Sequence, residues 1–348
     1  MREGHLVKPI RMYALDGARG LAAFSVLLFH LFGSYGMIFS NLYIAVDFFF
    51  ALSGFVLAHS LSKIENISQA LKFIVRRFFR IFPMVLAVLV FTVCYDLAII
   101  LKHLYFNEPS TPTIVLNLPT LLFSFTLLQI FYLPALLVNF PVWSLSAEWI
   151  VNFVSAFSML FIKRFFLKGA VLGFLMIITS WYLEDELLNQ LGRATWGFTL
   201  GVVSFNLRNR ILNFQIRTLA ILISLAFIPI YYSIQSLGSF QALLTIWPFL
   251  GTIVIFSSVD VGPVKKRFFA WLGKYSYGFY IWQIPMISIL SIVLKKFNWF
   301  VESSTLGQTL IILILGIVSI LFVTKLSLKF IEGPIRKLVS IRFGNPSN

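Results

Sequence analysis

Runs of about twenty apolar residues recur along almost the whole chain, and they constrain its fold more than any other feature. The chain is 59% apolar and 12% charged, with a mean hydropathy of +0.90, so it has too few polar residues to cover a water-soluble core. About twenty apolar residues cross a bilayer as one helix, whereas a membrane β-barrel needs alternating segments of about ten. The sequence therefore predicts an all-α polytopic membrane protein.

We expect about ten transmembrane helices. Their apolar windows lie near residues 20–38, 42–61, 81–102, 142–162, 169–184, 192–207, 216–235, 239–257, 276–294 and 305–327. A further apolar stretch, 113–138, contains Pro119 and Pro134 and is predicted to be re-entrant or interfacial. No cleavable apolar leader precedes the first window, so we expect no signal peptide.

The basic residues orient these helices and explain most of the net charge of +15. With the N-terminus inside, every basic residue falls on the cytoplasmic side except Lys102, Arg193, Lys295 and Lys296. Counting 113–138 as a span would place the later basic clusters outside. We therefore expect a multi-pass protein of the cell (inner) membrane with both termini cytoplasmic, membrane lipids as its neighbours and no nucleic-acid partner. The whole chain, 1–348, is expected to form one membrane domain without a separate soluble domain.

Three ionisable side chains within the predicted spans are candidates for chemistry, because a charge inside the bilayer is costly. His30 lies roughly 16 Å above the cytoplasmic end of its span, and Asp47 and Glu148 lie roughly 20 Å above the inner face. All three are expected in one layer. Because a tight turn joins the first two spans, we predict a hydrogen bond from His30 to Asp47 that orients the imidazole as a base. Asp16 is expected to cap the first span.

Arg19 precedes His30 by nearly three full helical turns, so both lie on one helix face, roughly 16 Å apart. An arginine at the cytoplasmic mouth and a histidine near the midplane suit a long ligand with an anionic head, and a coenzyme A (CoA) thioester has that shape. A second basic cluster, Arg76, Arg77 and Arg80, lies towards the same side. That cluster fits donor binding, but it equally fits a topology signal or a contact with lipid headgroups.

Five motifs follow one another along the chain: LDGARGLAAFSVLLFH (15–30), VDFFFALSGFVL (46–57), RRFFRIFP (76–83), PVWSLSAEWIVNF (141–153) and LGKYSYGFYIWQIP (272–285). In order and spacing they resemble the membrane acyltransferase-3 family of ten-span O-acyltransferases, which includes acetylases of O-antigens, exopolysaccharides and Nod factors. The resemblance extends from residue 12 to about residue 335.

The resemblance implies transfer of an acyl group, most often acetyl, from cytoplasmic acyl-CoA to a hydroxyl of a carbohydrate or glycolipid acceptor, with no metal expected. The family's functional positions fall on Arg19, His30, Asp47, Arg77, Arg80 and Glu148, and Arg76 adds charge to the donor site. The last two motifs supply candidate substrate-binding residues, namely Trp143, Ser144, Ser146, Tyr280 and Gln283.

Two positions depart from the family pattern. Gln283 stands where members often have a second histidine, and Trp149 stands where they often have a second glutamate. Some members carry an added SGNH hydrolase-like domain; here we expect the membrane domain itself, or a separate partner, to complete the transfer. His30 is expected to deprotonate the acceptor or to carry the acyl group transiently, and Glu148 to position the acceptor or manage the proton.

Two other functions fit the same residues. In a proton-coupled transporter or flippase of a sugar or lipid-linked substrate, the buried histidine and acids would form a proton relay. The absence of visible internal repeats and of paired broken helices argues against it. A sensor that only binds acyl-CoA or lipid is the third interpretation, and it is suggested by Gln283.

Overall fold

A computed structural model describes residues 12–32, 37–106, 118–132, 139–211, 240–258, 262–296 and 306–343. Within these ranges the chain is helical and has no β-strand, which confirms the predicted all-α class. The long helices are α1 (Tyr13–Phe32), α3 (Ala45–Leu61), α4 (Ile67–Phe106), α7 (Trp143–Phe161), α8 (Phe165–Leu183), α9 (Glu186–Ile211), α11 (Gln241–Ser258), α12 (Pro263–Lys296) and α13 (Leu306–Ser327). The shorter ones are α2 (Met37–Ser40), α5 (Leu118–Phe125) and α14 (Gly333–Phe343), with 3₁₀ turns η2 (Leu42–Ile44), η3 (Gln129–Phe131) and η4 (Phe140–Val142) and a π-helical turn, η6 (Leu328–Glu332).

Among the described residues, 8 helical segments are long and apolar enough to cross a membrane. Each of them overlaps one of the predicted spans. The predicted span 192–207 lies within α9, which is a continuous helix but too polar to belong to these 8 segments. The predicted span 216–235 lies outside the described residues. The chain is therefore a polytopic helical membrane protein.

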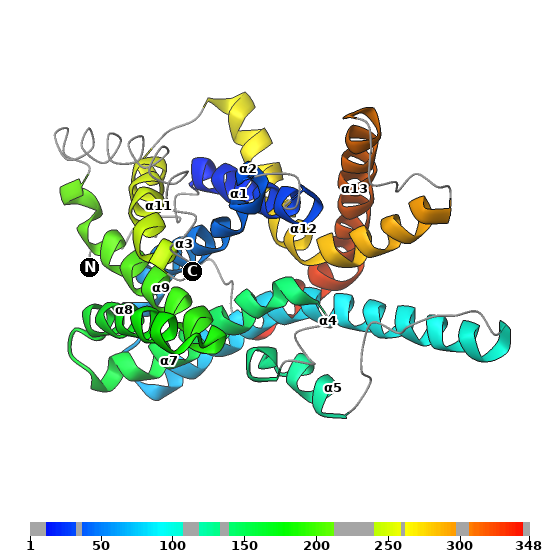
Figure 1. Ribbon diagram of the computed structural model, residues 1–348. Coiled ribbons are helices and arrows are strands. Elements are labelled where there is room, and N and C mark those ends of the chain that lie inside the picture. Colours follow the sequence, from blue (N-terminus) through cyan, green and yellow to red (C-terminus); the bar gives the residue numbers. More distant parts are fainter. Residues whose placement is uncertain are drawn as a thin grey trace.

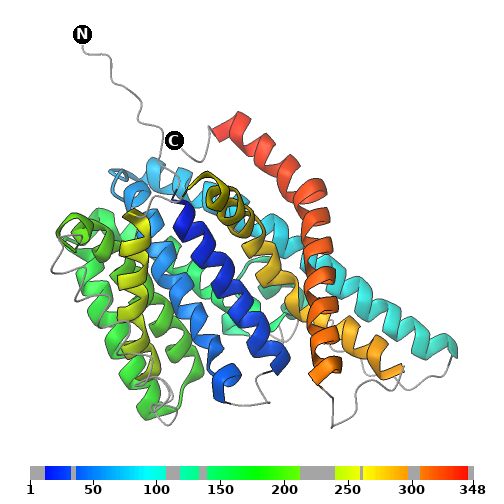
Figure 2. The same ribbon diagram turned by 90° about the horizontal axis from the view of Figure 1, so that it is seen from above.

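The helices form a bundle with α1 and α3 near its middle (Figure 1). The most extensive contacts join α8 to α9, α9 to α3, α1 to α12, and α12 to α13. Seen from above, the N-terminal end of α1, the junction between α3 and α4, and α14 lie at the same end of the bundle (Figure 2). We call this the arginine end, because it holds Arg19 and Arg80, and the opposite end the histidine end, because His30 lies towards it.

Helix α4 is much longer than the predicted span 81–102. Its 40 residues extend about 60 Å, roughly twice the hydrocarbon thickness of a bilayer. It runs along one edge of the bundle and projects beyond α13 (Figure 1). The motif RRFFRIFP (76–83) therefore lies inside a continuous helix, which fixes its arginines relative to one another.

The described part of 113–138 contains only α5 and η3, and neither is long enough to cross a bilayer. Ser146 of α7 anchors the turn between them: its hydroxyl donates to the Leu127 carbonyl at 2.7 Å and accepts from the Ile130 amide at 3.4 Å. Ser146 is fully buried. These hydrogen bonds give Ser146 a structural role, because they fix the turn between α5 and η3 against α7.

Helices α3 and α9 pack with their backbones in contact. A side chain at Gly54 would collide with the Phe198 carbonyl oxygen, and one at Gly201 would collide with the Ala51 carbonyl oxygen. Gly197 and Gly201 are spaced as in the small-residue pattern that brings membrane helices close together. Because backbone atoms cannot move aside as a side chain does, this contact fixes the register of α3 against α9.

Candidate functional site

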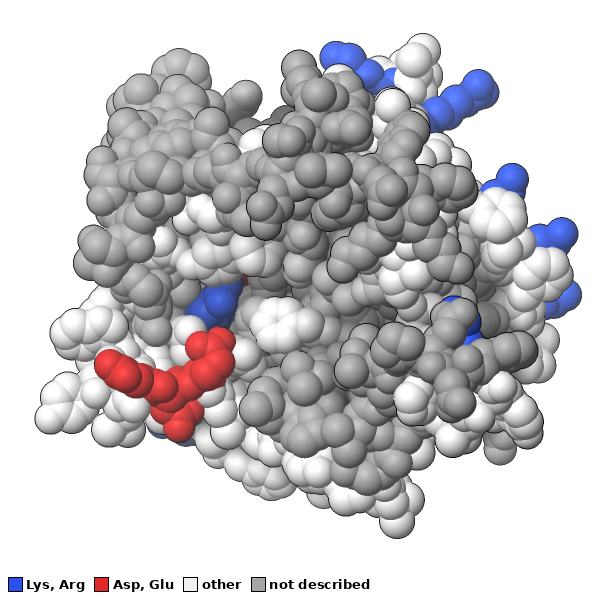
Figure 3. Space-filling model, turned by 45° about the vertical axis from the view of Figure 1, so that its right-hand side comes forward, with Lys and Arg blue, Asp and Glu red and all other residues white. Residues whose placement is uncertain are grey.

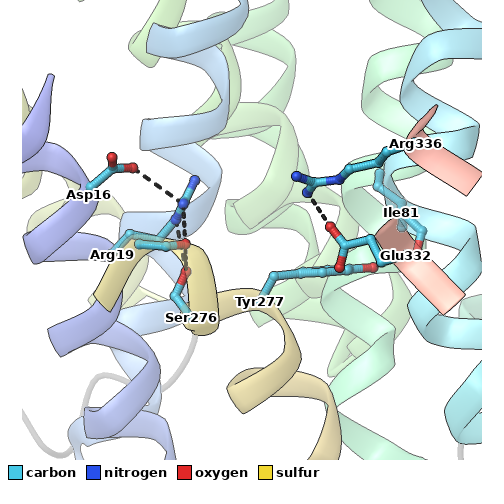
Figure 4. Close-up of polar contacts among 8 residues, drawn as sticks. Asp16, Arg19, Ile81, Ser276, Tyr277, Glu332 and Arg336 are labelled. Atoms are coloured by element: carbon cyan, nitrogen blue, oxygen red, sulfur yellow. Dashed lines mark hydrogen bonds and ion pairs between the residues drawn. The ribbon is translucent and has the colours of Figure 1, made fainter. Parts of the chain in front are cut away.

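Arg19 is held at the arginine end, where α1 packs against α12. Its guanidinium donates to Ser276 Oγ at 2.9 Å and to the Gly273 carbonyl at 2.5 Å, and it pairs with Asp16 at 3.3 Å (Figure 4). Asp16 lies inside α1, so its predicted role as a cap is wrong, and it positions Arg19 instead. The Arg19 side chain is still 28% exposed, so it is both fixed and accessible.

Arg77 and Glu148 form an ion pair within the bundle, joining α4 to α7. The Ser53 hydroxyl of α3 donates to the same carboxylate oxygen at 2.6 Å. The Arg77 and Glu148 side chains are only 10% and 14% exposed. Glu148 therefore holds the first arginine of the RxxR motif and neutralises its charge. Arg76 is half-buried and projects about 100° round α4 from Arg77.

Arg80 is exposed and, among the described residues, makes no hydrogen bond or ion pair. It interacts electrostatically with three other cations, Arg77, Arg19 and Arg336, and with two carboxylates, Glu148 and Glu332. We call these four arginines the arginine site. A cation surrounded by like charges is stabilised by a bound anion, and planar guanidinium groups bind phosphate with paired hydrogen bonds.

His30 lies near the other end of α1, beside Gln283 of α12. The Gln283 amide is close enough to act on the imidazole as a hydrogen-bond partner. Its Nε2 donates to the Tyr280 carbonyl at 2.8 Å, which leaves Oε1 to face the ring. His30 Nδ1 and Gln283 Oε1 are both buried, and neither atom has a hydrogen-bond partner among the described residues. The residue that departs from the family pattern is thus the polar neighbour of His30.

Asp47 binds Arg193 of α9, so the predicted hydrogen bond from His30 to Asp47 is wrong. Two hydrogen bonds, of 2.9 and 3.2 Å, join the guanidinium to the two carboxylate oxygens. The side chains are 8% exposed for Arg193 and 3% for Asp47. Arg193, which the orientation of the spans places towards the outer side of the membrane, is buried within the bundle. A carboxylate occupied in this way does not orient an imidazole.

The packing of α3 on α9 explains this pairing. Asp47 and Arg193 each lie one helical turn before the close backbone contact of the two helices, on the faces that meet. The rings of Tyr43 and Trp143 lie 5.5 and 5.4 Å from the guanidinium carbon and add cation–π contacts. Trp143, predicted to bind substrate, therefore packs against Arg193.

The predicted single layer of His30, Asp47 and Glu148 is wrong as well. Ser53, which binds Glu148, follows Asp47 on α3 by about 9 Å along the helix axis. Glu148 therefore lies deeper in the bundle, towards the arginine site. The site has two parts, the arginine site with Glu148 and the surroundings of His30, and α1 connects them.

Hydroxyl groups gather on the His30 side. Ser144 of α7 and Tyr280 of α12 are hydrogen-bonded to each other at 2.8 Å, and the hydroxyls lie 3.1 and 3.0 Å from the Pro141 carbonyl. Both residues are buried. The backbone carbonyl of Tyr280 also accepts the hydrogen bond from Gln283. Ser144, Tyr280 and Gln283 therefore form one network next to His30.

An acidic cluster lies at the turn between α8 and α9. Glu184, Asp185 and Glu186 are exposed, and Figure 3 shows acidic side chains gathered on one face, beside a hollow in which a basic side chain is visible. Glu186 acts electrostatically on Arg193 and accepts a hydrogen bond from Gln190 at 3.0 Å. Negative charge at this turn repels anions, whereas the arginine site attracts them.

Sequence reasoning missed four residues that the structure brings to the site. Arg193 does carry a signal, because a charge in the predicted span 192–207 needs a partner, but its position at the edge of that span favoured a loop. Glu332 and Arg336 have the four-residue spacing of a helical ion pair, which is a signal. They were missed because the orientation of the membrane helices already accounted for the basic residues near the C-terminus. Ser53 carries no signal, since a lone serine is ordinary in a membrane helix.

No three His, Cys, Asp or Glu side chains of the described residues gather as a metal site would require.

Fold and site together define a class of protein: a polytopic helical membrane protein that presents clustered arginines at one end and a histidine farther along the same helix face. The particular family follows from comparison with known sequences. The family model Acyl_transf_3, described as an acyltransferase domain, matches residues 12–325, and the chain belongs to this acyltransferase-3 family.

Two curated relatives are similar to the chain. Peptidoglycan O-acetyltransferase OatA of Listeria monocytogenes is 27% identical over 364 residues, covering 93% of this chain and 56% of that protein. Protein 2 in picA locus of Rhizobium radiobacter is 34% identical over 164 residues, covering 42% of this chain and 82% of that protein. The chain thus spans little more than half the length of the Listeria relative. No solved structure matches it.

Proposed function

We propose that the protein is a membrane O-acyltransferase that moves an acetyl group from acyl-CoA to a hydroxyl of a carbohydrate or glycolipid acceptor. Membership of the acyltransferase family supports acyl transfer, and the name of the Listeria relative supports acetyl as the group and a glycan as the acceptor. The observation that carries the proposal is Arg80, an exposed cation that faces three other arginines and has no acid bound to it among the described residues. Such a site requires an anionic ligand, and CoA carries several phosphates.

The donor enters at the arginine end in this proposal. Arg19, Arg77 and Arg80 bind its phosphates, and its thioester extends along α1 towards His30, a distance of roughly 16 Å. The excess of basic residues at this end supports a cytoplasmic location, with both termini in the cytoplasm and the chain acting as one domain of the cell membrane. The acceptor approaches from the histidine end. The acidic residues at that end, Glu184, Asp185 and Glu186, repel a second molecule of the anionic donor.

His30 acts as the base. Its imidazole takes the proton of the acceptor hydroxyl, the hydroxyl oxygen attacks the thioester carbonyl, and the carbon–sulfur bond breaks. The imidazolium then returns the proton to the departing thiolate, so that CoA leaves as a thiol. Gln283 orients the ring through its amide oxygen, and because the amide is neutral it fixes the tautomer without the increase in basicity that a carboxylate gives. Ser144 and Tyr280 offer hydroxyls to the acceptor sugar.

The two acids act through arginines rather than on the acceptor. Glu148 fixes Arg77 in the donor site, and Asp47 fixes Arg193, which in turn contacts the Trp143 ring. We therefore propose Asp47 and Glu148 as positioning residues. This leaves His30 as the base, without a carboxylate of its own.

His30→Ala tests the proposal. In proteoliposomes supplied with acetyl-CoA and a peptidoglycan fragment, we expect acceptor-dependent release of CoA thiol to fall about 10²–10⁴-fold, the usual contribution of a general base. His59→Ala is the matched control, because His59 is an exposed histidine near the end of α3, and its activity should equal that of the wild type. Unchanged thiol release by His30→Ala contradicts the assignment. A wild-type protein that moves a substrate across the vesicle membrane without releasing thiol is a transporter.

A further inference from the structure

Arg336 reaches the arginine site from the C-terminal part of the described chain. It lies on α14, which packs against α4, the helix that carries Arg77 and Arg80. Helix α13 continues into α14 through the π-helical turn η6. A π turn holds an extra residue and so changes by about 100° the direction in which the following side chains project; such turns are frequent at functional sites.

Glu332, the last residue of η6, holds Arg336 in an ion pair one helical turn away. The Glu332 side chain is only 2% exposed, whereas that of Arg336 is 56% exposed. Arg80 and Arg19 also act electrostatically on Glu332. Figure 4 shows the Glu332–Arg336 pair across from Arg19, with Tyr277 between them. A buried carboxylate thus restrains an arginine that would otherwise move freely in solvent.

The arginines differ in depth. The exposed fraction of the side chain rises from 10% for Arg77 to 28% for Arg19 and 56% for Arg336. A long ligand that enters with its thioester first leaves its far end next to the most exposed of these cations. In CoA the far end is the nucleotide, which carries a 3′-phosphate monoester, and the pyrophosphate lies between that group and the thioester. A phosphate monoester near neutral pH carries almost two negative charges, more than each phosphate of a pyrophosphate diester.

We propose that Arg336, positioned by Glu332, binds the 3′-phosphate monoester of the donor nucleotide and so distinguishes CoA from nucleotides that lack this group. This inference rests on the proposed function, in which the donor is acyl-CoA. Arg19, Arg77 and Arg80 then contact the inner phosphates, and Arg336 adds selectivity at the outer end of the same site.

The test measures binding of CoA and of 3′-dephospho-CoA to the full-length protein in a neutral detergent, by isothermal titration calorimetry. The wild type should bind CoA about tenfold more tightly than dephospho-CoA. Arg336→Gln should raise the Kd for CoA about tenfold and leave the Kd for dephospho-CoA within twofold, because the lost contact is to the missing phosphate. Lys325→Gln removes an exposed cation near the end of α13 and should retain the preference of the wild type.

Because Arg336→Gln leaves Glu332 buried without its cation, the double variant Glu332→Gln/Arg336→Gln is measured beside it, and it should show the same loss of preference. Equal weakening for both nucleotides, or no weakening for either, overturns the inference.

Thiol release from acetyl-CoA on the same preparations separates the two proposals. A preference for CoA that depends on Arg336 in a protein without acetyl transfer supports the subsite and refutes the O-acyltransferase. Acetyl transfer without that preference supports the O-acyltransferase and refutes the subsite.

Discussion

Asp47→Ala tests whether Asp47 serves Arg193 or His30. The side chains of the pair are 3% and 8% exposed, so the substitution leaves a buried guanidinium without its counter-charge. Removing one partner of a buried ion pair costs about 3–5 kcal/mol, and the contacts of Arg193 with Tyr43 and Trp143 place this case at the lower end, about 3 kcal/mol. We expect the unfolding midpoint of the detergent-solubilised protein, followed by tryptophan fluorescence, to fall by about 4 °C.

The double variant Asp47→Ala/Arg193→Met removes both charges and keeps an unbranched side chain between the two rings. Because replacing a buried pair with apolar groups is close to neutral, the midpoint should return to within about 2 °C of the wild type. Acetyl transfer should return with it, since Gln283 rather than Asp47 is the neighbour of His30. Glu65→Ala, at an exposed acid, should change neither quantity. A double variant that is stable but inactive would refute the reasoning, because Asp47 would then serve the chemistry.

Two further predictions concern the neighbour of His30 and the packing of α3. Gln283→Leu should lower kcat about tenfold and leave the KM for acetyl-CoA unchanged, because Gln283 adjoins His30 and not the arginine site. Steady-state kinetics at varied acetyl-CoA concentration measures both constants. A rise in KM without a fall in kcat would contradict this prediction. Gly54→Ala should destabilise the protein by about 1–3 kcal/mol, because the new methyl group meets the Phe198 carbonyl, whereas Gly262→Ala, with no atom within 4 Å, should not. Equal unfolding midpoints for the two variants would show that the backbones are not in contact.

The sequence predicts the helical class well, because a bilayer admits only helices and closed barrels as spanning structures. The predicted span 42–61 coincides with the segment Leu42–Leu61. The predicted span 81–102 covers only part of α4, since the preceding turns contain lysine and arginine, which a hydropathy window rejects although they continue the helix. Apolarity thus locates the part of a helix that lies in lipid, but not where the helix begins.

The pairing of charges was harder to predict than their presence. Asp47, Glu148 and Arg77 were all recognisable in the sequence, but the partner of each carboxylate was not. Asp47 pairs with Arg193, which is far away in the chain, because two helices meet at a glycine contact that fixes their register. His30 remains beside Gln283 instead. Periodicity shows which residues share a helix face, but it does not show which helix that face meets.

By itself, the sequence determined that the protein is a helical membrane protein, which of its residues carry ionisable groups in apolar surroundings, and that Arg19 and His30 share one face of a single helix. These properties depend on hydropathy and on the 3.6-residue period of one helix, which are local. Only the tertiary structure decided that Asp47 and Glu148 each bind an arginine, that Gln283 adjoins His30, and that Arg336 joins Arg80. The physical reason is that a charge pairs with whichever opposite charge the packing of helices brings within a few ångströms, and that packing depends on contacts between segments far apart in the chain.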